Sequence, residues 1–216
     1  MKLRMLLPAV LLGAVVTTGC ESTYYSAMEK VGFEKRDILV DRVESARDAQ
    51  EEAQEQFSSA LEQFSTLVNF DGGDLQDMYE NLSDEYEVAA ESAEAVSDRI
   101  DAIDDVSADL FEEWREELTE YSNEKLRRDS ERKLRDTERR AEKLITSMRR
   151  AEKRMAPVLA ALRDNVLYLK HNLNASAIGA LQGELGSIQS DVNQLLKEMN
   201  AAISESNEFI ASLNNG

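Results

Sequence analysis

The chain has 216 residues, of which 31% are charged and 6% aromatic, and it contains only nine glycines and two prolines. So few turn-forming residues exclude a protein built from many short strands and favour long helices. One cysteine and one histidine exclude a disulfide framework and the usual multi-cysteine or multi-histidine metal clusters. The formal net charge of −18 is a strong acidic excess.

Residues 1–19 have the pattern of a bacterial signal peptide. Lys2 and Arg4 precede an apolar stretch from Leu6 to Val16, which is too short to span a bilayer as a mature helix. The residues Thr17-Thr18-Gly19-Cys20 resemble a lipobox, in which small residues precede a cysteine that is lipidated and becomes the new N-terminus. We therefore expect lipidated Cys20 to anchor the chain to a membrane, with residues 20–33 as the anchor and tether. The alternative is a plain secretory signal followed by an unmodified cysteine.

The location that follows from this reading is the bacterial cell envelope, with the chain facing the periplasm. Glu21 follows the cysteine where an aspartate would signal inner-membrane retention in enteric bacteria, so the outer membrane is favoured over the inner. The longest later apolar stretch, from Met155 to Leu162, is too short to cross a membrane. We therefore expect a chain that is anchored and does not span.

Residues 34–216 are expected to form an all-α domain, an elongated antiparallel helical bundle or coiled coil of about four long helices. The first predicted helix runs from Leu39 to about Phe70. Asp71-Gly72-Gly73 predicts a turn after it, and Asp74 is a candidate N-cap for the next helix. The apolar positions of the first helix alternate steps of four and three: Leu39, Val43, Ala46, Gln50, Ala53, Phe57, Ala60, Phe64 and Leu67.

The second predicted helix ends near residues 104–107, where Ser107 is expected to cap a third helix. The third helix then reaches about Lys170, a length of about 95 Å at 1.5 Å per residue, with a kink and no break at Pro157. The seam of the second helix comprises Leu75, Tyr79, Leu82, Tyr86, Ala89, Ala93, Val96, Ile100 and Ile103. That of the third comprises Leu110, Trp114, Leu118, Tyr121, Leu134, Thr137, Ala141, Leu144, Met148, Ala151, Met155, Val158 and Leu162.

The fourth predicted segment follows residues 172–176, and three glycines, Gly179, Gly183 and Gly186, are expected to allow close helix contact. We expect the first and second helices along the early part of the long third helix and the fourth along its later part. The seam of this segment comprises Ile178, Leu181, Leu185, Ile188, Val192, Leu195, Met199, Ala202, Ser206, Phe209 and Leu213.

Charge is unevenly distributed along these helices. Residues 44–120 hold 25 acidic and three basic side chains, whereas residues 123–154 hold 13 basic and seven acidic ones. The basic stretch is interpreted as a solvated helix face with i, i+4 pairs at Glu124–Arg128, Glu131–Arg135 and Asp136–Arg140, attracted to the acidic helices. The alternative is a basic strip that faces anionic lipid or another envelope polyanion. Nucleic acid is not an expected partner, because the signal peptide exports the chain and no aromatic platform accompanies the bases.

The search for chemistry finds no glycine-rich phosphate loop and no nucleophile elbow. A two-metal site in a helical bundle requires Glu-x-x-His on two helices, and His171 is the only histidine. We therefore predict no catalytic residue, no metal site and no cofactor, and we do not expect an enzyme.

The segment KRDILVDRV, residues 35–43, is the most specific part of a stretch, residues 24–50, that resembles a bacterial family of predicted lipoproteins, domain of unknown function 2959. The resemblance implies no reaction and no site residues. The charged side chains of this segment are a candidate interaction surface, either a local charged network over an apolar patch or a docking surface for a partner: Lys35, Arg36, Asp37, Asp41 and Arg42. Tyr24 and Tyr25 are expected either at the membrane interface or against the bundle.

These features together predict a noncatalytic envelope lipoprotein that serves as a membrane-anchored helical scaffold or interaction protein, with an envelope protein as its partner. The alternative is an envelope binding module whose bundle holds a lipid, an amphipathic helix or an anionic envelope polymer.

Overall fold

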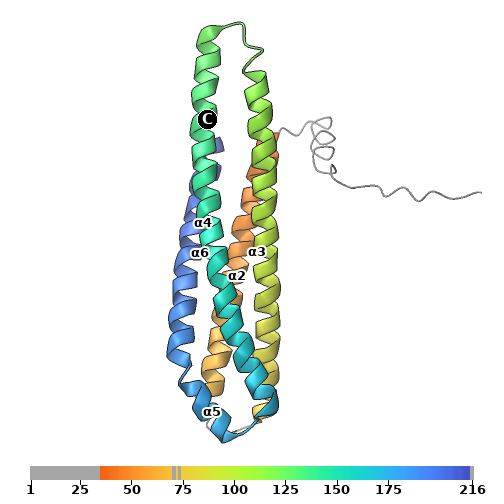
Figure 1. Cartoon of the computed structure of the whole chain (residues 1–216), viewed down its shortest axis with the longest axis vertical. Helices are drawn as coiled ribbons and strands as arrows, with labels where there is room; N and C mark the ends of the chain where they lie inside the picture. Colours follow the sequence, from red (N-terminus) through yellow and green to blue (C-terminus); the bar gives the residue numbers. More distant parts are fainter. Residues whose placement is uncertain (1–34, 70–71, 73, 215–216) are drawn as a thin grey trace, which may run out of the picture. The chain divides into compact units, whose positions relative to one another are not determined.

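The computed structural model describes residues 35–69, 72 and 74–214, and all regular secondary structure in this part of the chain is helical. The helices are α2 (Lys35–Val68), α3 (Leu75–Glu117), α4 (Glu124–His171), α5 (Ala175–Gln182) and α6 (Leu185–Asn214), as Figure 1 shows. The prediction of an all-α helical bundle is confirmed. The signal peptide, Cys20, the tether and the paired tyrosines Tyr24 and Tyr25 lie outside the described residues.

The four long helices pack in a ring, in which α2 and α4 each contact both α3 and α6 (Figure 1). Contacts between α3 and α4 join Ser97 to Glu152 and Arg115 to Glu138, so residue numbers fall along one helix as they rise along the other. The same relation holds between α4 and α6, where Lys143 pairs with Glu205 and Arg150 with Glu198. α4 therefore runs in the opposite direction to both α3 and α6.

The predicted seams form the core of this bundle. Every seam position of α2 from Leu39 to Leu67 is fully buried, including the polar Gln50. In α3 five of the nine seam positions are buried: Leu82, Ala89, Val96, Ile100 and Ile103. The other four are half-buried: Leu75, Tyr79, Tyr86 and Ala93. Burial of one apolar stripe per helix supplies the hydrophobic stabilisation that isolated narrow seams lack.

The turn between α2 and α3 follows the sequence prediction. Gly72 has φ of +139°, a conformation that side chains with a Cβ rarely adopt. Asp74 caps α3 as predicted, since its carboxylate accepts a hydrogen bond of 2.9 Å from the backbone N–H of Gln76.

The predicted reversal at residues 104–107 is wrong. α3 continues to Glu117, and Ser107 is a buried residue inside the helix. The chain turns after Leu118, and Asn123 caps α4 by accepting hydrogen bonds from the N–H groups of Lys125 (3.0 Å) and Leu126 (3.2 Å). No glycine or proline lies between residues 104 and 117. A single serine with capping ability does not end a helix whose apolar seam continues.

The third predicted helix is therefore shorter than expected. α4 has 48 residues, which corresponds to about 72 Å at 1.5 Å per residue. Leu110 and Trp114, which were assigned to its start, belong to the end of α3. Pro157 lies inside a continuous α4, so the helix is not broken there.

The fourth predicted segment is two helices, because α5 ends at Gln182 and α6 begins at Leu185. The expected close contact through glycines is wrong, since a Cβ added at Gly179 or Gly186 would meet no atom within 4 Å. The expected division of helices along the third one is also wrong. α6 packs against α2 as well as α4, and Gln54 of α2 donates a hydrogen bond of 3.2 Å to the Leu196 carbonyl.

Candidate functional site

The ring of four long helices is closed along most of its length and open at one end. The α3–α4 hairpin extends beyond the first turn of α2 and the last turn of α6 (Figure 1). Lys35, the first residue of α2, pairs with Glu113 of α3 at 3.0 Å and marks this step. We call residues 114–134 the hairpin end, and residues 75–113 of α3 with 135–171 of α4 the closed section. Tyr121 and Leu126 in the hairpin end are 41% and 53% exposed.

An open cavity of about 840 Å³ lies at the step, and we call it the end cavity. Its apolar wall comprises Leu110, Trp114, Ala211 and Leu213, from α3 and α6. Nε1 of Trp114 donates a hydrogen bond of 2.8 Å to Oγ of Ser130. This bond orients the indole ring and gives its only polar atom a partner. The remaining lining residues are polar or charged: Arg36, Lys133, Asp136, Thr137, Arg140, Glu208 and Ser212.

Two arginines at the end cavity, Arg36 of α2 and Arg140 of α4, are exposed and form no ion pair with any residue that the structure describes. Their neighbour Arg139 pairs with Asp136 at 2.9 Å. Asp136 is one of the two carboxylates that line the cavity, and its ion pair with Arg139 compensates its charge. Glu208 is the other, so positive charge exceeds negative charge around the opening.

The structure separates the five residues of the candidate interaction surface. Lys35 pairs with Glu113 of α3, and Arg36 lines the end cavity. Asp37 and Asp41 are exposed one turn apart, and neither forms an ion pair with Arg36 or Arg42 among the described residues. Arg42 is half-buried, and its Nε is buried with no hydrogen-bond partner there. Of the five, only Arg36 lies in the end cavity.

Sequence reasoning missed most of the end cavity. It assigned Trp114 and Leu213 to apolar seams and Arg140 to an ion pair with Asp136, and it placed none of the three at a cavity. The signal that would have found them is helix length, because the capping residue Asn123 sets the hairpin turn beyond the level where α2 begins. Trp114 is also the only tryptophan in the chain.

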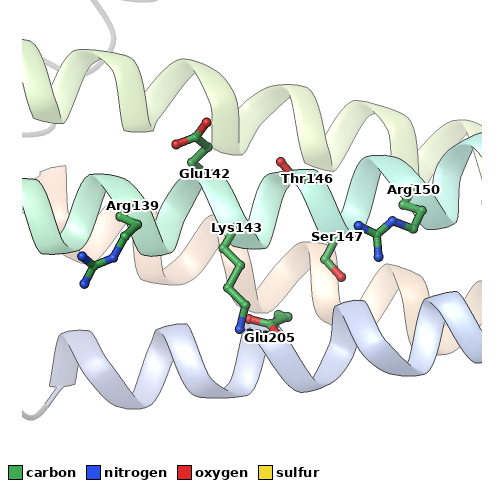
Figure 2. A pocket seen from close by; sticks show the side chains of 7 residues that line it. All are labelled: Arg139, Glu142, Lys143, Thr146, Ser147, Arg150 and Glu205. Carbon is green, nitrogen blue, oxygen red and sulfur yellow. Dashed lines mark ion pairs between the residues drawn. The ribbon is translucent and has the colours of Figure 1, made fainter.

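The basic stretch of α4 is largely paired. Figure 2 shows Lys143 reaching towards Glu205 of α6, and the two charged atoms are 2.7 Å apart. This hydrogen bond raises the pKa of Lys143. A polar groove of about 320 Å³ lies around the pair. Of the three predicted pairs within α4, Glu124–Arg128 (3.2 Å) and Glu131–Arg135 (2.7 Å) form. The third is wrong, because Asp136 pairs with Arg139 and not with Arg140.

Arg149 joins α4 to α3 through the most extensive charged network of the bundle. Its guanidinium contacts Asp101, Asp104 (2.8 Å) and Glu152 (3.2 Å), and its side chain is 28% exposed. Partial burial disfavours the charged form, but the hydrogen bonds that the guanidinium donates to these carboxylates outweigh that effect and raise the pKa of Arg149. The basic stretch thus holds neighbouring helices in register.

His171 is the last residue of α4 and is exposed, where a cation suits the negative end of the helix dipole. In residues 35–69, 72 and 74–214, no three His, Cys, Asp or Glu side chains are grouped so that they would hold a metal ion. None of the described helices is both long and apolar enough to cross a membrane.

Comparison with curated proteins gave no match. Residues 24–213 match the family described as protein of unknown function (DUF2959), which agrees with the resemblance of the KRDILVDRV segment. The match spans nearly all of the described helices together with the residues that precede them. The chain therefore belongs to this family.

Proposed function

We propose that this protein is a noncatalytic lipoprotein of the bacterial cell envelope that acts as a membrane-anchored helical scaffold or interaction protein. The observation that carries the proposal is the step at which α3 and α4 continue past the ends of α2 and α6 (Figure 1), with Tyr121 and Leu126 exposed in the hairpin end. Exposed Tyr121 and Leu126 give a partner apolar side chains to cover. A long paired bundle also suits a role in spacing other components.

The proposed anchor is Cys20, the only cysteine in the chain, at the end of a lipobox-like sequence. Each methylene buried in lipid contributes about 0.8 kcal/mol, so several acyl chains on one cysteine anchor a protein essentially irreversibly. Glu21 after the cysteine favours the outer membrane over the inner, with the bundle facing the periplasm.

The anchor is tested by replacing Cys20 with serine. We expect Cys20→Ser to move the protein from the membrane fraction to the soluble fraction while its helical circular dichroism stays unchanged, because Cys20 precedes the bundle. Metabolic labelling with a fatty acid should mark the wild-type chain and not the variant. An unlabelled wild-type chain would contradict the lipoprotein proposal.

The scaffold role is tested by site-specific crosslinking in the native envelope. A photo-crosslinking amino acid at Tyr121 should capture a discrete partner protein, because Tyr121 lies in the hairpin end. The matched control position is Val88, which is 42% exposed on α3 within the closed section. Capture at Val88 but not at Tyr121 would place the interaction elsewhere, and capture at neither would count against a protein partner at the hairpin end.

A second candidate function, a binding module for a lipid, an amphipathic helix or an anionic polymer, is favoured by the end cavity. Native mass spectrometry of protein purified from its own envelope separates the two candidates. A stoichiometric small molecule supports the binding module, and a copurifying protein supports the scaffold.

A further inference from the structure

We propose that the end cavity binds one single-chain anionic amphiphile, of the fatty acid type. Its acyl chain lies against Leu110, Trp114 and Leu213, and its acidic head group contacts Arg36 and Arg140. This inference deepens the second candidate function and rests on it. The argument combines the lining of the cavity, its size and the two arginines that lack ion-pair partners.

The apolar wall comes from the place where the four-helix core ends. Leu110 and Trp114 follow the seam of α3, and Leu213 is the last seam residue of α6. α3 and α4 continue past the last turn of α6 (Figure 1), and Leu110, Trp114 and Leu213 line the cavity at this level, Leu213 being largely buried already. An acyl chain in that space removes apolar surface from water, which contributes roughly 25 cal/mol per Å².

The size of the end cavity suits a small molecule such as a single acyl chain. Its volume of about 840 Å³ lies within the range of roughly 300–1,000 Å³ that is usual for small-molecule sites.

The charge at the opening favours an anion. Most bases of α4 near this end have a carboxylate partner: Arg127, Arg128, Arg132, Arg135, Arg139 and Lys143. Arg140 of α4 and Arg36 of α2 are exceptions at the cavity, and they come from different helices. Of the two carboxylates there, Asp136 pairs with Arg139, and Glu208 lies in the field of Lys143. An acidic head group would provide the negative charge with which Arg36 and Arg140 form no ion pair among the described residues.

The direct test uses Trp114 as a reporter, because it is the only tryptophan and lines the end cavity. The full chain carrying Cys20→Ser is purified without detergent and titrated with a fatty acid brominated near the end of its acyl chain. We expect saturable quenching of Trp114 fluorescence at one ligand per chain. The corresponding brominated alcohol, which lacks the charge, should bind about tenfold more weakly.

Three variants assign the binding to this cavity. Arg36→Gln with Arg140→Gln should weaken fatty acid binding about tenfold and leave the alcohol unaffected. Arg132→Gln, which changes an arginine of α4 that pairs with Asp129 outside the cavity lining, is the matched control and should change neither. Ala211→Phe, which places a ring at the cavity wall, should weaken both ligands. Helical circular dichroism confirms that each variant is folded.

Several outcomes overturn the proposal. One is the absence of saturable quenching in a folded chain. Another is equal binding of acid and alcohol that is insensitive to the double arginine change, which means apolar partitioning only. Quenching that an acidic amphipathic peptide produces and the fatty acid does not assigns the site to a protein partner. None of these outcomes affects the anchor or the crosslinks at Tyr121, so failure of the ligand and failure of the scaffold are distinguishable.

Discussion

The closed section and the hairpin end belong to the same pair of helices, but α2 and α6 pack beside that pair only in the closed section and end before the tip of the hairpin (Figure 1). In the closed section Ile100 of α3 and Leu144 of α4 are at most 1% exposed, because α2 and α6 cover them. In the hairpin end Tyr121 and Leu126 are exposed. A heptad pattern therefore shows which side of a helix needs a partner, but not whether the same chain supplies that partner.

The largest expected difference between the regions is in the cost of removing an aromatic side chain. Phe57 is fully buried in α2, and Phe57→Ala should lower the free energy of unfolding by about 3–5 kcal/mol. Trp114 is larger but half-buried beside an open cavity, so Trp114→Ala should cost less, about 1–2 kcal/mol. Guanidinium denaturation followed by circular dichroism measures both. Equal losses would mean that the hairpin end packs as tightly as the closed section.

The second prediction concerns a buried polar side chain in the closed part of the bundle, Gln50 of α2. Gln50 is fully buried, and neither atom of its amide has a hydrogen-bond partner among the described residues. Leaving a buried amide unsatisfied costs about 1–3 kcal/mol, so Gln50→Leu should raise the free energy of unfolding by an amount of that order.

The matched control is Gln54→Leu, one turn away on α2. Gln54 donates a hydrogen bond to the Leu196 carbonyl, and its loss should lower the free energy of unfolding by about 1 kcal/mol. If both variants are destabilised in urea denaturation, the Gln50 amide has a partner in solution, such as a buried water.

A third comparison concerns two arginines of α4. Arg149 bridges to α3 through three carboxylates, so Arg149→Gln should lower the free energy of unfolding by about 1–2 kcal/mol. Arg139 is 74% exposed and pairs only within α4, so Arg139→Gln should change it by less than about 0.5 kcal/mol. Urea denaturation of the two variants measures both, and similar values would show that the bridge to α3 adds little.

Periodicity predicted most of the core because the apolar stripe that a helix buries is written in that helix's own sequence. The seam of α2 was correct at every position, and Asp74 was identified from its place after a glycine turn. The turn at residues 118–123 was misplaced, since Ser107 has the residue type of a cap and only the continued seam shows that it lies inside a helix.

The end cavity and the Arg149 bridge were beyond the sequence argument. The cavity depends on how far α3 extends past Lys35, the first residue of α2. That distance depends on where α3 ends and on where α2 begins. Pairs within α4 follow from a spacing of three or four residues, but the partners of Arg149 depend on the register and rotation of α3 against α4. Neither quantity is fixed by local residue types.

Apart from the control variants, the smallest expected effect is that of salt, and it tests how charge acts across the closed section. The mature chain expected after cleavage before Cys20 has 23 basic and 43 acidic side chains, and such an excess of one sign destabilises a compact state. Salt at 0.1 M screens charges farther apart than about 10 Å. Screening relieves repulsion among the acidic side chains of α2 and α3, but it also weakens the bridges of α4 to its neighbours. Those bridges are few and their side chains are partly exposed, so we expect net stabilisation. The melting temperature of the lipid-free chain should rise by about 2–4 °C between low and moderate sodium chloride, which corresponds to roughly 1 kcal/mol for a chain of this length. A falling melting temperature would mean that the contacts of Lys143, Arg149 and Arg150 across helices outweigh the repulsion between α2 and α3.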